Sequence, residues 1–349
     1  MKNLISLFIL CLLFATYTQA QQITVALHHN GKATMFYGSN AFSDANTAAV
    51  DGDTIYLPGN SYYSGINISH KLVIIGAGVN PDSTSATGKS YIVSDINFMA
   101  GSDGSLIHGI YTTNNIHFNN NTRINDITIS RCYLGGIYFD GSFDTSHTCR
   151  NTVVEQNIIT GSIQFDNAEY TIIRNNFIQG RLYNITQNVL IENNDLFYST
   201  EAWNGGQYTI YGINNSVVRN NIFTYPASHT SCYIVGDNNE IVNNIFPYPG
   251  NPSCYNNTYA NNYPVVGDTI FVAQTGYYSS FDFSKNYNLK TPSLYAGFYS
   301  NGVGVYGGMK PMKVAMVPIN PHVISKTIAP STDNSGNLNI NVKVDAQNK

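Results

Sequence analysis

The chain has 349 residues, and its 17 basic and 21 acidic side chains give a formal net charge of only −4. Just 11% of the residues are charged, and the basic ones are dispersed, which excludes the clustered basic face that nucleic-acid-binding proteins use. Asparagine, glycine and tyrosine are abundant instead. Because asparagine competes with helical backbone hydrogen bonds and favours turns, a mainly helical fold is also excluded.

Residues 1–20 have the pattern of a secretory signal peptide. Lys2 supplies the positive start, residues 4–15 the apolar core and residues 18–20 a cleavage site of small residues. The apolar core is too short for a comfortable membrane span, and no later segment is long and apolar enough to cross a bilayer. We expect export and cleavage near Gln21, which places the mature chain in the periplasm, at the cell surface or outside the cell, with no transmembrane segment.

From Ile107 to Phe246 one short sequence motif recurs, in which an apolar residue and an outward residue precede a turn that is often Asn-Asn. The interval between copies varies from 18 residues (Ile173 to Ile191) to 27 residues (Ile191 to Val218). Such a variable period with β-rich phrases indicates stacked coils whose insertions emerge as loops. The leading apolar residues are Ile107, Ile129, Val154, Ile173, Ile191, Val218 and Val242.

Each copy has a second short strand in which apolar residues flank an outward one, the alternation of a half-buried strand. These second strands begin at Ile116, Ile137, Ile163, Leu182 and Ile210. Stacking the copies predicts parallel sheets in which each coil pairs with its neighbours about 4.8 Å away. The fold class expected is therefore an all-β solenoid, a single-stranded parallel β-helix, with one continuous core.

The Asn-Asn pair is expected at a corner of each coil, because asparagine tolerates the left-handed backbone conformation of a tight bend. Its amide both donates and accepts, so one asparagine from each coil could form an internal hydrogen-bonded ladder. The expected members are Asn157, Asn176, Asn194, Asn221 and Asn244. Their predicted role is structural.

The residues that follow the leading apolar positions alternate in charge, as Glu155, Arg174, Glu192 and Arg219. At strand spacing each carboxylate meets a guanidinium, and exposed pairs of this kind contribute about 0.2–1 kcal/mol each. We interpret them as a stabilising charge ladder rather than as a catalytic Arg–Glu pair.

Four cysteines follow the signal segment: Cys132, Cys149, Cys232 and Cys254. An even number in an exported chain permits two disulfides. Cys232 and Cys254 are about one coil apart, so they could form a bridge, or they could be small buried residues. After Pro311, two β-rich stretches from Val323 and from Leu338 flank a turn near Gly336, which predicts a C-terminal hairpin docked against the rod.

These features resemble the right-handed parallel β-helix proteins of the pectate-lyase-like superfamily (pectin lyase fold), in particular its exported bacterial members. Residues 42–50, 52–59 and 71–78 are similar to the opening of such proteins, and residues 287–289, 293 and 304–308 to their closing coil. The resemblance implies an N-terminal strand and helical cap over 21–57, a β-helix over 58–308 and a C-terminal tail over 309–349.

The resemblance implies less about activity, because this scaffold carries many chemistries. Enzymes of the superfamily hold calcium with clustered carboxylates beside an Arg or Lys base, or pair aspartates in Asn-Thr-Asp and Asp-Asp motifs. The polygalacturonase and alginate-epimerase motifs are absent here, and only His108-Gly109 matches half of a Gly-His-Gly motif.

An outward column on the second strands is the first candidate ligand site. Stacking aligns Tyr138, Tyr183 and Tyr211, with His117 and Gln164 between them in the series. In the superfamily the polysaccharide cleft usually follows this sheet, and here an insertion over 196–207 with Trp203 adjoins it. Aromatic rings stack on sugars while their polar groups bind hydroxyls. The alternative is cross-strand pairing that only stabilises the sheet.

Asp140 and Asp166 follow equivalent strands of adjacent coils, so their carboxylates are expected to approach each other. Such a pair could bind Ca²⁺ with Asp144, or act as an acid with Arg181 as the base. The alternative is that both aspartates are ordinary turn residues. No cofactor other than Ca²⁺ is suggested.

We predict an exported, non-catalytic β-helix protein that binds extracellular polysaccharide or a cell-surface component. One alternative is a polysaccharide lyase or glycoside hydrolase at Asp140, Asp166 and Arg181. Another is a structural envelope protein.

Overall fold

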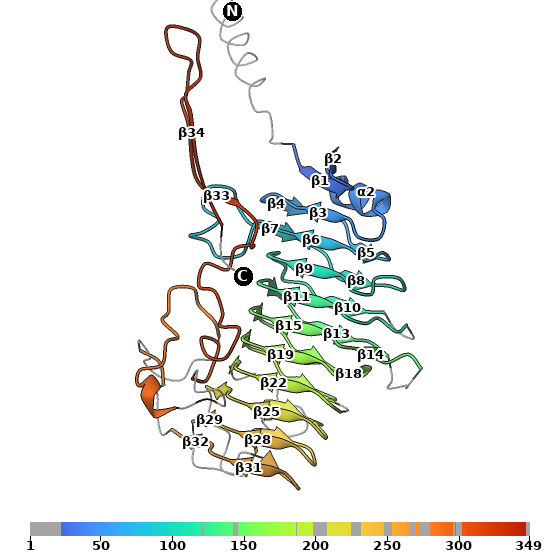
Figure 1. Ribbon diagram of the computed structural model, residues 1–349, viewed down its shortest axis with the longest axis vertical. Coiled ribbons are helices and arrows are strands. Elements are labelled where there is room, and N and C mark those ends of the chain that lie inside the picture. The colour runs from blue at the N-terminus through green and yellow to red at the C-terminus, as the bar shows by residue number, and fades with distance from the viewer. Residues whose placement is uncertain are drawn as a thin grey trace, which may run out of the picture.

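The structure is a computed structural model that describes residues 22–119, 122–141, 146–185, 187–197, 208–224, 232–247, 253–265, 270–272, 280–295, 297 and 302–346. Within these residues the chain forms a rod of stacked coils, with one α-helix at its N-terminal end and an antiparallel hairpin near the C-terminus (Figure 1). The predicted all-β parallel solenoid is confirmed.

Three long sheets run along the rod in the described part of the chain. The twelve-stranded sheet contains, in spatial order, β2 (Lys32–Tyr37), β1 (Thr24–His29), β3 (Thr54–Tyr56), β6 (Val73–Ile75), β9 (Leu106–His108), β11 (Thr128–Ser130), β15 (Val153–Glu155), β19 (Ile172–Arg174), β22 (Leu190–Glu192), β25 (Val217–Arg219), β28 (Glu240–Val242) and β31 (Thr258–Ala260).

The nine-stranded sheet contains the predicted second strands. In order they are β5 (Ile66–Ile68), β8 (Ile96–Phe98), β10 (Ile116–Phe118), β13 (Ile137–Phe139), β17 (Ile163–Gln164), β21 (Leu182–Tyr183), β24 (Ile210–Tyr211), β27 (Ile234–Val235) and β30 (Ser253–Cys254).

A seven-stranded sheet forms the third face, which the repeated sequence pattern did not predict. It contains β12 (Tyr133–Leu134), β16 (Ile158–Ile159), β20 (Phe177–Ile178), β23 (Asp195–Leu196), β26 (Ile222–Phe223), β29 (Ile245–Phe246) and β32 (Tyr263–Pro264). Three two-stranded sheets pair β4 (Asn60–Tyr62) with β7 (Ser90–Ile92), β14 (Cys149–Arg150) with β18 (Ala168–Glu169), and β33 (His322–Ile328) with β34 (Ile340–Asp345).

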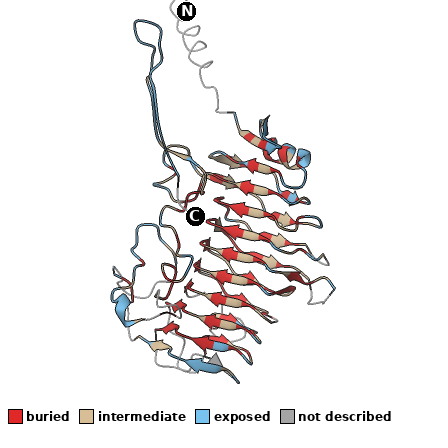
Figure 2. Ribbon diagram, in the orientation of Figure 1, coloured by how far each residue is buried: buried red, intermediate tan, exposed pale blue. Residues whose placement is uncertain are grey.

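The core consists of columns of equivalent apolar side chains. Ile107, Ile129, Val154 and Ile173 are directly paired on successive strands, and each is fully buried (Figure 2). Along the nine-stranded sheet, Phe98, Phe118, Phe139 and Phe165 form a second column with ring centroids 5.1, 4.2 and 5.7 Å apart. Each such side chain contributes about 1.5–3 kcal/mol by burial, so the repeated apolar positions supply most of the stabilisation.

In the last copy of the repeated motif, the inward apolar residue lies one position earlier than predicted. Val218 pairs with Ile241, so Ile241 is the inward residue and Val242 occupies the outward position next to Arg219. The sequence is apolar at both positions, so alternation could not distinguish them there. The Asn-Asn pair of this coil is accordingly Asn243 and Asn244.

The second asparagine of each pair points inward and joins successive coils. Asn157 Nδ2 donates to Asn176 Oδ1 at 3.0 Å, and the backbone N–H of Asn157 donates to the same oxygen at 2.9 Å. Asn157 Nδ2 also donates to the carbonyl of Ile129 in the preceding coil. The same hydrogen bonds recur between the coils that follow, and this asparagine column comprises Asn157, Asn176, Asn194, Asn221, Asn244 and Asn262.

The first residue of each corner has the left-handed backbone conformation. Asn175, Asn193 and Asn220 have φ of 53°, 56° and 56°, and Gln156 and Arg131 take the same conformation in earlier coils. The side chains of Asn175, Asn193, Gln156 and Arg131 point out of the coils and donate to backbone carbonyls of a distant part of the chain, whereas Asn220 Nδ2 lies 3.4 Å from Asn193 Oδ1. Asn175 Nδ2, for example, lies 2.9 Å from the carbonyl oxygens of both Val305 and Gly307.

That distant part, residues 302–318, is called here the return segment. It follows the rod from the C-terminal coils towards the first coils, and it covers the seven-stranded sheet (Figure 1). Gln156 Nε2 donates to the carbonyl of Pro311 at 2.9 Å, and Arg131 Nη1 donates to that of Val317 at 3.0 Å. Ile158, Phe177 and Ile222 of the sheet are buried in one cluster with Val303, Val305, Met312 and Met316.

The expectation of a closing coil at residues 304–308 is therefore wrong. The last described strands of the three sheets end at Pro264, and residues 304–308 lie outside the coils as part of the return segment. Gly304 has φ of +74°, and a Cβ there would collide with Ile222 and Asp195. The glycines are needed because the return segment approaches the sheet so closely.

The two termini of the described chain differ in how they meet the rod. Helix α2 (Ala41–Ala48) covers the N-terminal coil as expected, burying Ala41, Phe42 and Ala45. The hairpin β33–β34 is present, but the prediction that it docks against the rod is wrong, because all of β34 is exposed (Figure 2). Only the start of β33 is half-buried.

The outward charges of the twelve-stranded sheet form two close pairs. Arg174 Nη2 lies 2.6 Å from Glu155 Oε2, and Arg219 Nη2 lies 2.8 Å from Glu192 Oε2. The predicted pairing is confirmed. Among the cysteines, Cys132 and Cys149 are buried free thiols, whereas Cys232 is in a disulfide. The side chain of Cys254 lies outside the described residues, so its pairing with Cys232 stays a prediction.

Replacing Asn194 by alanine tests the asparagine column. The change leaves the backbone N–H and the Nδ2 of Asn176 without their common acceptor, and the carbonyl of Ile173 without its donor. A buried group left without a partner costs about 1–3 kcal/mol, so we expect Asn194→Ala to lower the free energy of unfolding by at least about 2 kcal/mol. Chemical denaturation measures this loss. Asn339→Ala, at an exposed position, is the control, and equal stability of the two variants would contradict the prediction.

Candidate functional site

The predicted outward column on the nine-stranded sheet is present in the predicted order. His117 pairs with Tyr138, Tyr138 with Gln164, Gln164 with Tyr183, and Tyr183 with Tyr211, all on consecutive parallel strands. Their apolar neighbours point into the core, so these five side chains point outward. Four are half-buried, and Tyr211 is exposed. We call this set the tyrosine column.

Contacts within the tyrosine column fix several of its side chains. The rings of His117 and Tyr138 are stacked with centroids 5.2 Å apart, so each covers one face of the other. The Tyr183 hydroxyl donates to Gln164 Oε1 at 2.7 Å. Tyr211 stacks on Tyr208, with centroids 5.7 Å apart. The column is therefore an ordered surface with fixed polar groups, and both stabilising pairs and ligand contacts are compatible with it.

The two aspartates beside the column have different partners. Asp140 Oδ2 lies 2.8 Å from His117 Nδ1, and because an ionised carboxylate only accepts, the histidine Nδ1–H is the donor. Asp166 accepts from Gln164 Nε2 through one oxygen and from Asn184 Nδ2, at 2.6 Å, through the other. Among the described residues, Asp140 and Asp166 have no hydrogen-bond partner in common, so these bonds do not support the expected common site.

The structure gives less support to the other residues that were predicted to bind or act on a ligand. Arg181 precedes β21 and is only 8% exposed, so its side chain is covered rather than presented to a substrate. Asp144 and Trp203 lie outside the described residues. Within the ranges that the structure describes, no group of three or more His, Cys, Asp or Glu side chains could hold a metal ion, so the predicted Ca²⁺ site has no support there.

The pairing of His117 with Asp140 is a feature that sequence reasoning missed. Both residues were named, but separately, as a column member and as a candidate acid. The signal that could have joined them is the register itself. Tyr138 on the next strand pairs directly with His117, and Asp140 lies two positions after Tyr138 in the chain. A carboxylate on Nδ1 orients the ring and leaves Nε2 for another partner.

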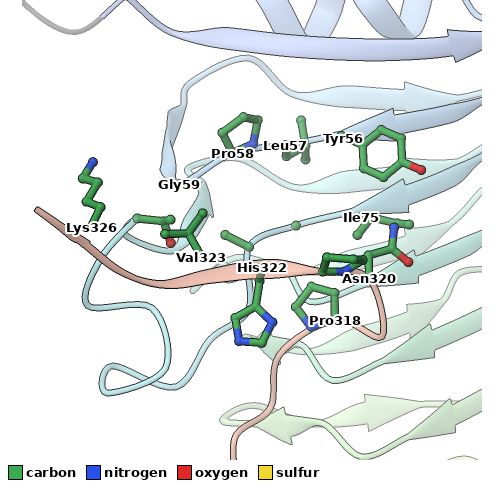
Figure 3. Close-up of a pocket in the computed structure, with 14 residues that line it drawn as sticks. Tyr56, Leu57, Pro58, Gly59, Ile75, Pro318, Asn320, His322, Val323 and Lys326 are labelled. Atoms are coloured by element: carbon green, nitrogen blue, oxygen red, sulfur yellow. The ribbon is translucent and has the colours of Figure 1, made fainter. Parts of the chain in front are cut away.

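A pocket of about 570 Å³ lies elsewhere, between the C-terminal tail and the first coils (Figure 3). Leu57, Pro58 and Ile75 line it from the coils, and Pro318 and Val323 line it from the tail. The pocket shares no residue with the tyrosine column, and none of its described lining residues is a carboxylate. It could not be predicted, because its two walls are more than 230 positions apart in the chain.

Two buried ionisable groups lie near the return segment. Asp195 is fully buried, and its Oδ1 accepts from the Val305 N–H at 3.2 Å. Burial raises its pKa well above the usual value, against the smaller effect of that hydrogen bond, so the carboxyl is held in its neutral form. His108 lies 2.6 Å, through Nδ1, from Ser130 Oγ, and burial together with the charge of Arg131 lowers its pKa to about 4. Both groups are adapted to the protein interior, and neither is presented to a ligand.

His108 makes the stability depend on pH. Its pKa is about 4 in the folded chain and about 6.5 when unfolded, so the unfolded state takes up the proton first as the pH falls. The contribution is complete above pH 6.5 and is lost between pH 6.5 and 4, up to roughly 3 kcal/mol. We expect His108→Gln to remove this part of the pH dependence, measured by denaturation at several pH values. The exposed His28→Gln is the control, and an unchanged slope in His108→Gln would contradict the assignment.

Comparison of the chain with family models, with curated proteins and with solved structures finds no match. In the described part of the chain, no helix has the length and apolar character needed to cross a membrane. The geometry of the rod is therefore the basis for assigning a function.

Proposed function

We propose that this protein is an exported, non-catalytic β-helix of the pectate-lyase-like type that binds extracellular polysaccharide, or a cell-surface glycan, along the tyrosine column. The observation that carries the proposal is the outward alignment of aromatic and hydrogen-bonding side chains on five consecutive strands. Among the described residues, the return segment covers Ile158, Phe177 and Ile222 of the seven-stranded face, and the twelve-stranded face has its central charges paired.

The length and chemistry of the column suit a polymeric glycan. Four steps of about 4.8 Å separate His117 from Tyr211, so the column is about 19 Å long. Tyrosine rings offer apolar faces, and the Gln164 amide and tyrosine hydroxyls offer hydrogen bonds to sugar hydroxyls. Asp140 and Asp166 add negative charge beside the column, which disfavours polyuronates and other acidic polymers. A neutral polysaccharide is therefore the ligand class that we propose.

The partners of the acidic residues support binding rather than catalysis. Asp166 is held through both oxygens by Gln164 and Asn184, and Asp140 by His117. A general acid and a base must both reach the scissile bond, and the buried Arg181 does not offer its side chain for that.

Calorimetric titration of the purified chain with neutral and acidic oligosaccharides tests the proposal. We expect binding of a neutral glycan, with Tyr183→Ala weakening it several-fold, because an aromatic contact contributes about 0.5–1.5 kcal/mol. Tyr183→Phe, which keeps the ring and removes the bond to Gln164, should have a smaller effect. Tyr37→Ala changes an exposed tyrosine of β2 as the control. If neither class of glycan binds, the proposal is wrong.

A polysaccharide lyase or hydrolase is the second candidate, and the His117–Asp140 pair is the observation that favours it. An imidazole oriented by a carboxylate can act as a general base. A lyase would leave an unsaturated product that absorbs in the ultraviolet, and a hydrolase would release reducing ends. We expect neither signal from the wild-type chain. Turnover that disappears in His117→Gln and in Asp140→Asn, with glycan binding retained, would overturn the non-catalytic proposal.

A further inference from the structure

The hairpin β33–β34 projects beyond the N-terminal end of the rod, and its far part has few contacts with the rest of the chain (Figures 1 and 2). Every residue of β34 is exposed, and Ile340, Val342 and Val344 are 56%, 50% and 54% exposed. A two-stranded hairpin is at best marginally stable in water without further strands or packing. Its apolar side chains therefore need a partner that the single chain does not supply among the described residues.

The two faces of the hairpin differ in chemistry. Directly opposite residues of an antiparallel pair share a face. One face combines Val323 with Val344, Lys326 with Val342, and Ile328 with Ile340. The other face combines His322 with Asp345, Ser325 with Lys343, and Thr327 with Asn341. The hairpin is thus amphipathic, with β34 carrying most of the apolar face.

Its two outer edges also differ. Strand β33 has a register irregularity between Val323 and Ser325, and it places Lys326 on the apolar face. A bulge and an inward lysine are features that discourage a strand edge from pairing. Strand β34 is regular and has neither feature on its apolar face. The unprotected edge of the hairpin is therefore the outer edge of β34.

We propose that two copies of this chain associate through this edge, with β34 of each pairing antiparallel about a two-fold axis at Val342. Ile340 of one copy then faces Val344 of the other, and Asn341 faces Lys343, so apolar meets apolar and polar meets polar. The product is a four-stranded antiparallel sheet in which both apolar β34 strands are central and both Lys326-bearing β33 strands are at the edges.

The sequence of β34 restricts the register. A shift by one residue brings the apolar face of one copy onto the polar face of the other. Centring the axis on Lys343 would place two lysines directly opposite each other, which is destabilising. A two-fold pairing uses the same edge in both copies and leaves no further open edge on β34, so it ends at the dimer.

Sedimentation and cysteine cross-linking of the full chain test this pairing. Opposite Cα atoms of an antiparallel pair are about 5 Å apart, within the range of a disulfide, so Val342→Cys should cross-link to a covalent dimer under mild oxidation. Ile340→Cys is the matched control, because the two copies of residue 340 would be four positions, or about 13 Å, apart along the strands. The native thiols of Cys132 and Cys149 are buried and should not compete.

We expect the wild-type chain to sediment as a reversible dimer and Val342→Lys to sediment as a monomer. Thr327→Lys, on the polar face of β33, should leave the dimer intact. A wild-type monomer at high concentration, open-ended association, or equal cross-linking of the two cysteine variants would overturn the proposal. Cross-linking by Val342→Cys alone supports the register even if Val342→Lys unfolds the hairpin.

Discussion

The architecture depends on one hydrogen-bonding arrangement, the inward asparagine amide that connects each coil to the next. A parallel stack has no turn to set its register, because consecutive strands of one sheet are separated by a whole coil. The asparagine oxygen accepts from the backbone and side chain of the preceding coil, and its nitrogen donates to a carbonyl of that coil. Slippage by one residue would leave all of these buried groups without partners, which is costly in the dry interior.

The neighbouring corner residue extends the effect to the surface. Its left-handed conformation turns the side chain outward, where Asn175, Gln156 and Arg131 donate to carbonyls of the return segment. A single dipeptide thus joins the coils inside and fastens a long irregular segment outside. The return segment buries Ile158, Phe177 and Ile222 of the seven-stranded face. The tyrosine column remains on another face, and its side chains are held by their own contacts.

The first coil is covered by the N-terminal elements, whereas the hairpin beyond the same end is exposed. At the N-terminal end, α2 and the antiparallel strands β1 and β2 cover the first coil, and β2 becomes the outermost strand of the twelve-stranded sheet. Beyond the same end, the hairpin presents a regular apolar strand with no cover. Such an exposed apolar strand is suited to a specific partner, and a second copy satisfies the pattern of β34.

Alternation and repetition in the sequence alone determined the coils, the parallel pairing, the inward asparagines and the order of the tyrosine column. These features depend on contacts between residues about one coil apart, and the same sequence pattern recurs in many coils. The copy in which the residue after the inward position is also apolar, Val242 after Ile241, is the one whose register was predicted wrongly.

Only the tertiary structure decided which face is covered, which residue holds each aspartate, and where the hairpin lies. The return segment meets Asn175 across 130 positions, and no periodicity reports such a contact. Its glycines resemble a closing coil in sequence, because close approach to a sheet requires the same residue whether the segment joins the coils or lies over them. The physical reason is that a repeated local pattern encodes neighbours within the stack, whereas single long-range contacts depend on shape and burial that exist only after folding.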